Sequence, residues 1–296
     1  MKITIITKNF IVVAKVWFVV MGSFFSLLSI ILSFVSWEEL GIKNVYCKVL
    51  AFVIIVVISL FMAVLWVCCI KRKNTIWESG NRKIVIRYGD IMKISFPKKE
   101  KGNRIVVIPV NTCFDTQVDE KLANQDKPLV SPNTIHGKWI KGMAEKGREK
   151  KTLDKAIENY IKMKGSKVVK EIDAKIKSRG KLKQYEIGEI AVIEGDNGVD
   201  FFLLALTDFD DNNNAQSSKE SIIECLKKKL DFYNENGQGF EIYIPLVGTG
   251  MARCGLSHEE ALQTIKAVLQ LYSDKITGEV NVVIYSKDKE KVSIYS

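Results

Sequence analysis

Three short segments of the chain carry glycine, asparagine or aspartate where such residues can bind an anion or a polar ligand. The strongest signal is IPLVGTGMARCGLSHEEA, residues 244–261, in which a buried strand is followed by a glycine-bearing loop and a helix. Glycines let the backbone approach an anion closely, and the free N–H groups of a loop and a helix start bind phosphate. A tight connection into a helix also needs glycine, so the pattern alone leaves both interpretations open.

The other two segments each place one polar side chain at the end of an apolar strand. Asn111 closes the run RIVVIPVN, and Asp90 follows the run that ends in Tyr88-Gly89. Asn111 can also be a cap or turn residue, and Asp90 by itself is an ordinary turn carboxylate. Ligands of α/β folds bind at the carboxyl ends of strands, where both side chains stand.

The other reactive residues do not predict a catalytic centre or a metal site. The chain has two histidines, His136 and His258, and six scattered cysteines without a CxxC pair. This makes a zinc site or a disulfide framework unexpected. No Ser-His-Asp or Cys-His set stands at a motif spacing. We therefore predict no catalytic residues, no metal and no resident cofactor.

The elements that must position these segments alternate between strands and helices, which predicts an α/β fold. Strands, the first of them with a turn, are expected at 82–94, 104–111, 187–194, 201–207, 240–246 and 280–286. Helices are expected at 217–233 and 257–272, and Ser257 and Glu260 form a capping-box pattern at the start of the second. The turn Asp196-Asn197-Gly198 predicts a β-hairpin.

Residues 112–132 read as loop, and residues 135–183 read as a basic, mostly helical insertion broken by Gly142, Gly147, Gly165 and Gly180. Between 138 and 183, 16 Lys and Arg stand against 6 Asp and Glu, which is the whole net charge of +10. A solvated insertion, attraction to anionic lipid and attraction to nucleic acid are the three interpretations. Aromatic residues are sparse there, so nucleic acid is not expected as a partner.

Taken together, the three segments resemble a macro domain, the ADP-ribose-binding α/β module. The resemblance covers about residues 84–285 and implies a three-layer α/β/α fold. In that family an aspartate after the first strand hydrogen-bonds the adenine amino group, which carries over to Asp90, with Ile91 beside the ring. The first ligand loop of the family follows a strand that ends in asparagine. It is matched here by Pro109, Val110, Asn111, Thr112, Phe114 and Asp115.

The second ligand loop of the family follows a strand reading IPxxGTG. Residues 244–250 match it closely, so the resemblance implies a loop that wraps the diphosphate and distal ribose of an ADP-ribose derivative. The residues with that role are Gly248, Thr249, Gly250, Met251 and Ala252, with Arg253 as a further anion contact.

The first ligand loop departs from the hydrolytic members of the family. Many of these carry a GGGVA-type run after the asparagine, whereas residues 114–120 read FDTQVDE. This loop and the two apolar runs described below are similar to the membrane effectors of Thoeris-type antiphage systems. In those systems a TIR-domain enzyme makes an ADP-ribose conjugate from NAD. For a chain with this layout the resemblance implies that the conjugate is histidine–ADP-ribose. Asp115, Asp119 and His136 are the candidate contacts of the added group.

Two uncharged apolar runs, 16–35 and 49–70, stand at the start of the chain. Each is long enough to span a bilayer as a helix, about 30 Å. A signal peptide competes for the first run, but no A-x-A-like cleavage site follows and a second run comes 13 residues later. Lysine and arginine flank the pair, so we expect a multi-pass inner-membrane protein with both termini cytoplasmic.

The predicted division is a transmembrane hairpin at 1–73, a connector at 74–81 and a cytosolic macro-like domain at 82–296 with its insertion at 135–183. In the first run, Gly22, Ser26, Ser29 and Ser33 form a stripe of small residues. This stripe can pack on the second run of the same chain or on another protomer.

We therefore expect an antiphage membrane effector that is not an enzyme. Its macro domain binds the signal, the chain forms a homo-oligomer, and the hairpins disrupt the lipid membrane, which kills the cell or arrests growth. One alternative is a membrane-tethered ADP-ribose hydrolase. A second is a scaffold or lipid binder that uses the basic insertion, whose binding would fall steeply with salt.

Overall fold

The computed structural model describes residues 3–100, 102–119, 129–175, 177–209, 215–216, 218–248 and 255–296. The chain forms two compact units. The first, the hairpin unit, contains Met1–Asn74 and Val292–Tyr295. The second, the sheet unit, contains Thr75–Lys291 and Ser296. Each unit is described below by itself.

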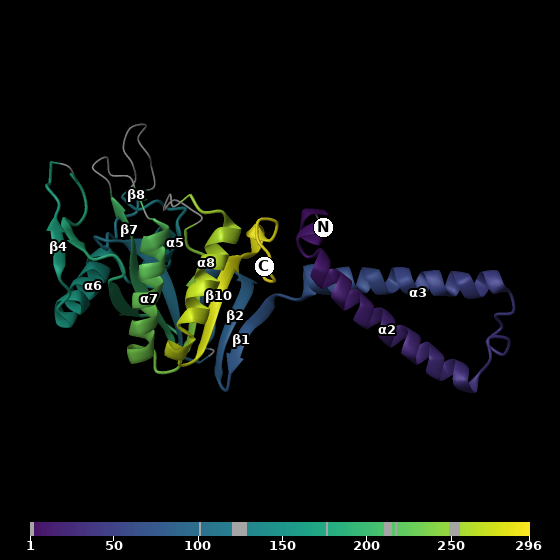
Figure 1. Ribbon diagram of the computed structural model, residues 1–296. Helices are drawn as coiled ribbons and strands as arrows, with labels where there is room; N and C mark the ends of the chain where they lie inside the picture. The colour runs from purple at the N-terminus through teal and green to yellow at the C-terminus, as the bar shows by residue number, and fades with distance from the viewer. Residues whose placement is uncertain are drawn as a thin grey trace. The chain divides into compact units, whose positions relative to one another are not determined.

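The hairpin unit is built on two long apolar helices (Figure 1). A short helix α1 (Ile3–Lys8) precedes α2 (Phe10–Phe34), and α3 (Val45–Leu65) continues into a π-helical turn, η1 (Trp66–Ile70). The helices Phe10–Phe34 and Val45–Ile70 are long and apolar enough to cross a membrane. Both begin before the apolar runs do. The helix α3 is capped by Asn44, whose side chain accepts from the Tyr46 N–H at 2.9 Å.

The two long helices contact each other through residues other than the stripe of small residues on α2. The Trp17 Nε1–H donates to Ser59 Oγ at 3.0 Å, and the Phe25 and Phe52 rings lie 5.2 Å apart. The stripe residues are all exposed; they are Gly22, Ser26, Ser29 and Ser33. In the structure the stripe therefore does not pack on α3, and its second interpretation, a contact with another protomer, stays a prediction.

The last residues of the chain complete the hairpin unit. Ser293 Oγ donates to the buried Asn9 side chain, and Asn74 Nδ2 donates to the Ile294 carbonyl at 3.2 Å. The Tyr295 side chain packs against an apolar cluster that includes Val13 on α2 and Val67 on η1. Val292–Tyr295, which the sequence places in the macro-like domain at 82–296, are thus grouped with the N-terminal helices.

The sheet unit contains a mixed sheet with the strand order β1-β2-β10-β9-β3-β7-β6, and β8 pairs with β7. The run from β2 to β7 is parallel, and β6 joins it antiparallel to β7. The strands are β1 (Lys73–Ser79), β2 (Arg82–Gly89), β3 (Arg104–Asn111), β6 (Ile190–Glu194), β7 (Val199–Phe209), β8 (Ala215–Gln216), β9 (Glu241–Pro245) and β10 (Glu279–Tyr285). The parallel strands read as continuous apolar runs because helices cover both faces.

Helices lie on both faces of the sheet (Figure 1). On one face lie α4 (Ile91–Ser95), α5 (Ile135–Glu145) and α6 (Lys150–Lys164), whose apolar residues share a core with β3, β6 and β7. On the other face α7 (Lys219–Asn236) packs on β7 and on α8 (His258–Leu271). Two 3-10 turns, η2 (Ser273–Lys275) and η3 (Ser286–Asp288), flank β10. The unit is thus a three-layer α/β/α sandwich, as predicted.

Several local predictions are confirmed. The run 104–111 is β3. The β6–β7 hairpin turns at Asn197 and Gly198, which have φ values of 57° and 72° as a tight hairpin requires. The predicted capping box opens α8, because Ser257 Oγ accepts from the Glu260 N–H at 3.2 Å and the Glu260 carboxylate accepts from the Ser257 N–H at 2.8 Å.

Two segments near the start of the sheet differ from prediction. Residues 74–81, expected as a connector, form most of the edge strand β1 and the turn into β2, because Gly80 at φ 59° lets the chain reverse. Residues 91–94, expected in the first strand region, lie in the short helix α4. The Asp90 side chain begins this helix by accepting from the Met92 N–H at 3.0 Å.

The insertion is helical only as far as Lys164. Beyond it, β4 (Val168–Glu171) and β5 (Lys183–Tyr185) form a small antiparallel sheet, so the expectation of helix up to 183 is wrong there. Gly142, expected to break the helix, lies inside α5. A Cβ at this position would lie 2.4 Å from the Phe96 ring, so glycine is present because α4 and the residue after it approach closely.

Candidate functional site

The predicted site segments meet at one edge of the sheet. Asp90 follows β2, Leu246 follows β9 and Asn111 ends β3, and these three strands run parallel in the order β2-β10-β9-β3. The strands β3 and β9 are neighbours. The chain after β3 continues to strands on one side of this pair, including β7, and the chain after β9 continues to β10 on the other side. Open α/β sheets bind ligands at such a reversal of strand order, beyond the carboxyl ends of the strands.

The two strands that flank the reversal are not paired at their carboxyl ends. The ladder between β3 and β9 runs from Arg104 to Val106, whereas β3 continues to Asn111. Pro109 lies in the stretch that β9 does not pair, although it is paired with Leu204 of β7, and it has no N–H to donate. The backbone at the end of β3 is therefore not held by β9, and Pro109 and Val110 carry Asn111 to the sheet edge.

Asp90 presents one free carboxylate oxygen at this edge. Its Oδ1 caps α4 through the Met92 N–H, and no bond to its second oxygen is found within the described residues. The neighbouring Tyr88 ring has the Lys289 Nζ 4.8 Å from its centroid. Ile91 is 7% exposed and belongs to the core beneath. Asp90 can thus accept a hydrogen bond from a ligand, whereas Ile91 mainly supports the helix start.

Asn111 is nearly buried and holds its side-chain amide in one orientation. Its Oδ1 accepts from the Asp115 N–H at 3.1 Å, and the following residue, Thr112, donates its N–H to the Thr207 carbonyl at 2.9 Å. Within the described part of the chain no partner is found for the Asn111 Nδ2. The amide group therefore has two N–H donors left for a ligand oxygen.

Two other residues predicted in the first ligand loop are buried. Thr112 is fully buried, and Phe114 packs its ring edge-on against Tyr185 at 5.8 Å between centroids. Phe114 has φ 52°, an uncommon value for a bulky residue, which turns the chain sharply after β3. Their ligand roles stay predictions, and the structure shows that both residues shape the loop from inside.

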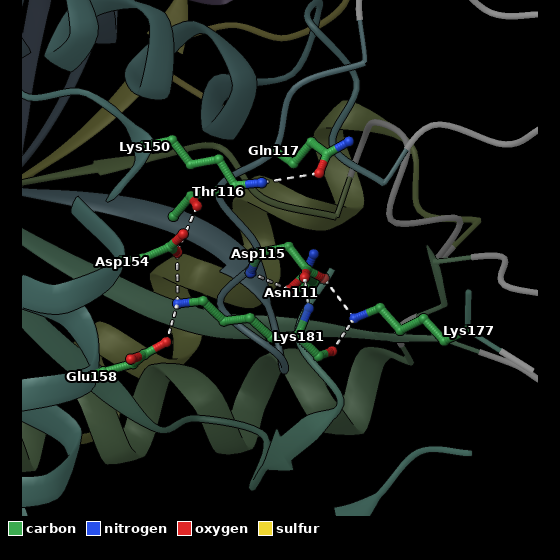
Figure 2. A network of polar contacts seen from close by, with 9 residues as sticks. All are labelled: Asn111, Asp115, Thr116, Gln117, Lys150, Asp154, Glu158, Lys177 and Lys181. Carbon is green, nitrogen blue, oxygen red and sulfur yellow. Dashed lines mark hydrogen bonds and ion pairs between the residues drawn. The ribbon is translucent and has the colours of Figure 1, made fainter. Parts of the chain in front are cut away.

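Asp115 lies in a buried polar network (Figure 2). Its two carboxylate oxygens accept from the Lys177 Nζ and from the Lys181 backbone N–H, each at 2.7 Å. The aspartate is 1% exposed. The carboxylate predicted to meet a ligand is therefore already occupied by residues of the insertion.

The two remaining candidate contacts also face the insertion. Asp119 accepts from the Leu129 N–H at 2.8 Å and pairs with Arg179 at 3.2 Å. His136, in the first turn of α5, is 7% exposed. Burial, with the positive charge of Lys181, lowers the pKa of His136 to about 3, so its imidazole is neutral at pH 7.

The glycine loop is described only at its two ends. Gly248 has φ 89° and Gly255 has φ 69°, values that favour glycine. The predicted ligand residues Thr249, Gly250, Met251, Ala252 and Arg253 lie outside the described residues. After the loop, α8 begins with His258, whose Nε2 lies 3.7 Å from Asp288 of η3. The segment after β9 and the segment after β10 are thus in contact through His258 and Asp288.

Lys177 and Lys181 are site-supporting residues that the sequence did not single out. In the sequence they are two of 16 cations in a basic insertion, and nothing in their spacing marks them as paired with Asp115. Between them only Gly180 gives a local signal in the sequence, which is that of a helix breaker. In the described residues no three His, Cys, Asp or Glu side chains come together to hold a metal ion.

Comparison with known proteins gives matches over most of the chain. The family described as Thoeris protein ThsA, Macro domain, matches residues 84–285. The Thoeris protein ThsA of Bacillus amyloliquefaciens (strain Y2) is 25% identical over 269 residues, which cover 89% of this chain and 82% of that protein.

Among solved structures, a macrodomain of Oceanobacillus iheyensis with ADP is 15% identical with a TM-score of 0.41, covering 76% of this chain and 94% of its own. A macrodomain protein from Streptomyces coelicolor is 11% identical with a TM-score of 0.30, covering 68% and 97%.

Proposed function

This chain belongs to the Thoeris ThsA macro-domain family, a family of antiphage proteins, and we propose that it is a membrane effector gated by an ADP-ribose-derived signal. The family match spans the same residues, 84–285, that the sequence motifs indicated. The predicted resemblance is therefore confirmed. The sensing of the signal, the oligomerisation and the membrane damage are the proposed steps.

The observation that supports sensing is the gathering of three ligand-type segments at one sheet edge. Within the described residues Asp90 has an acceptor oxygen without a partner and Asn111 has N–H donors without a partner, and β9, which leads into the glycine loop, lies between β2 and β3 in strand order. β10 and β9 stand between β2 and β3 in the sheet, so a ligand that reaches from Asp90 to Asn111 has to be elongated, as a nucleotide is. An adenine at Asp90 and a diphosphate at the glycine loop would put the far end of the ligand at Asn111.

The signal in this proposal comes from a TIR-domain enzyme that consumes NAD, and histidine–ADP-ribose is the proposed compound. Ligand favours an assembled form of the chain because that form binds it more tightly. The two apolar helices lie in the inner membrane with both termini in the cytoplasm. Clustered hairpins then disrupt the membrane, and the exposed stripe from Gly22 to Ser33 on α2 is free to contact another hairpin.

The experiment that tests sensing uses the full chain in detergent, titrated calorimetrically with ADP-ribose and with histidine–ADP-ribose. We expect Asp90→Ala to weaken binding of both nucleotides by about tenfold, the effect of losing one good hydrogen bond to a charged acceptor. Light scattering in the same samples should show growth in particle size only for chains that bind.

Asp90→Asn is the matched control for the fold. Because Asp90 also caps α4, an alanine costs about 1 kcal/mol of stability, whereas asparagine keeps the cap and removes the charge. Thermal unfolding separates this loss from the loss of binding. A wild-type chain that binds neither nucleotide would rule out the sensing proposal. Release of free ADP-ribose from an ADP-ribosylated protein would instead favour a hydrolase.

A further inference from the structure

One buried ion pair connects the first ligand loop to the basic insertion (Figure 2). The Lys177 and Asp115 side chains are 3% and 0% exposed. The Lys177 Nζ donates to Asp115 at 2.7 Å and also to the Lys181 carbonyl oxygen at 2.6 Å. The Lys181 N–H donates to the other oxygen of Asp115. Charges persist in such a buried place only when they are paired and hydrogen-bonded, as both are here.

Gly180 brings the insertion backbone against the Asp115 carboxylate. It has φ 82°, and a Cβ built on it would lie 2.3 Å from Asp115 Oδ1 and 2.5 Å from the Leu129 side chain. No other residue fits there without moving the carboxylate. We call the set Asp115, Lys177, Gly180 and Lys181 the clasp.

A second set of contacts fixes the clasp to α6. The Lys181 Nζ lies 2.9 Å from Asp154 and 3.7 Å from Glu158. Asp154 also accepts from the Thr116 hydroxyl at 2.6 Å, and Thr116 directly follows Asp115. The loop after β3 is therefore held from two sides by one segment of the insertion, Lys177 to Lys181.

The clasp acts on Asn111 through the backbone of Asp115. The Asp115 N–H donates to Asn111 Oδ1 at 3.1 Å. Because the partner is an N–H, the oxygen of the Asn111 amide must face it, and the Nδ2 group must point the other way. The Asn111 amide is thereby presented as a donor at the sheet edge, where it has no partner in the described part of the chain.

We propose that Asp115 is a positioning residue of the ligand site, and that Lys177 and Lys181 hold it so that Asn111 donates to the ligand end farthest from Asp90. This inference rests on the proposed function and adds a role for the basic insertion. Asp115 itself does not contact ligand. Its effect should be confined to ligands that reach Asn111, since Asp90 follows β2 and Asn111 ends β3, with β10 and β9 between these two strands.

The test compares ADP with ADP-ribose, because ADP lacks the part that reaches Asn111. Full-length Gly180→Ala opens the clasp without changing any charge, and Asp115→Asn/Lys177→Met removes both buried charges together. We expect each to weaken ADP-ribose binding at least about tenfold and ADP binding less than about twofold. The control Lys170→Met removes an exposed lysine from the same insertion and should change neither affinity.

The outcomes separate the clasp from the sensing proposal. If ADP and ADP-ribose weaken equally in the clasp variants, or if neither weakens, the clasp supports only the fold and the positioning role is wrong. A wild-type chain that binds neither nucleotide contradicts the sensing proposal instead. Thermal unfolding checks that each variant is folded. The double variant leaves no unpaired buried charge, so it carries the test if Gly180→Ala does not fold.

Discussion

At the scale of single residues, the burial of Lys229 on α7 lowers the stability of the fold. Its side chain is fully buried, and its Nζ has no hydrogen-bond partner in the described part of the chain. Burial lowers the pKa of Lys229 to about 7, and the nearby Cys225 only partly opposes this. The same burial raises the pKa of the Cys225 thiol to about 12. Neither group is set up to contact a ligand at the sheet edge, so their effect is on stability.

We expect Lys229→Met to stabilise the sheet unit by about 2–4 kcal/mol at pH 7, because methionine fills a similar volume without an amine to desolvate. The lysine is protonated when unfolded and has a lowered pKa when folded, so unfolding takes up a proton between about pH 7 and 10. Wild-type stability therefore rises with pH over that window.

The measurement for Lys229 is urea unfolding at pH 7 and pH 9, followed by near-UV circular dichroism. The methionine variant should show a smaller change between the two pH values than the wild type. Lys227→Met, at an exposed position on the same helix, is the control: it removes the contact of the Lys227 Nζ with the Tyr272 ring and should shift both curves by the same amount. A methionine variant that is less stable than wild type at both pH values would contradict this account.

At the scale of elements, the close packing of α5 against α4 and the residue after it explains why a glycine, Gly142, lies inside the helix α5. Gly142 lies in the middle of α5, and the Phe96 ring that follows α4 occupies the space of a Cβ. Phe96 is in turn packed on Phe201 of β7, with ring centroids 5.8 Å apart. The ring therefore has little freedom to move away from the helix.

Gly142→Ala should destabilise the protein although alanine is the better helix former. The helix gains about 1 kcal/mol from the substitution, whereas overpacking in a close contact costs about 1–3 kcal/mol. We expect a net loss, measured as a lower midpoint of thermal unfolding. Adding Phe96→Leu makes room and should recover part of it. A raised midpoint for Gly142→Ala alone would show that the Phe96 ring moves freely.

At the scale of the whole molecule, the chain passes between its two units more than once. It leaves the hairpin unit after Asn74 and returns at Val292. The returning segment follows η3 and is held in the hairpin unit by Ser293, which donates to Asn9. The chain therefore crosses between the units after Asn74, after Lys291 and after Tyr295.

Ser293→Val should separate binding from membrane damage. Valine has the size of threonine, the residue of the control variant, but no hydroxyl. The buried Asn9 oxygen therefore loses its donor, which costs about 1–3 kcal/mol in the hairpin unit. We expect unchanged ADP-ribose affinity by calorimetry and slower dye release from liposomes that contain the full chain. Ser293→Thr retains the hydroxyl and should behave as wild type. Equal release from both variants would show that this second link plays no part.

The sequence determined the features that depend on local pattern. Alternating apolar runs and turn residues gave the α/β class, and the strand limits of β3 followed from a β-branched run that ends at Asn111. The capping box of α8 and the turn at Asn197 and Gly198 involve residues close together in the chain, so their chemistry is readable without the fold. The motifs around Asp90, Asn111 and the glycine loop also pointed to the family.

Only the tertiary structure decided which of these residues are free to act. Asp115 and Lys177 are 62 residues apart, and nothing local shows that both are buried and paired with each other. The same holds for Ser293 and Asn9, and for Gly142 and Phe96. Contacts of this kind depend on which surfaces the packed layers bring together. A side chain's role at the site is therefore set by what covers it as much as by its type.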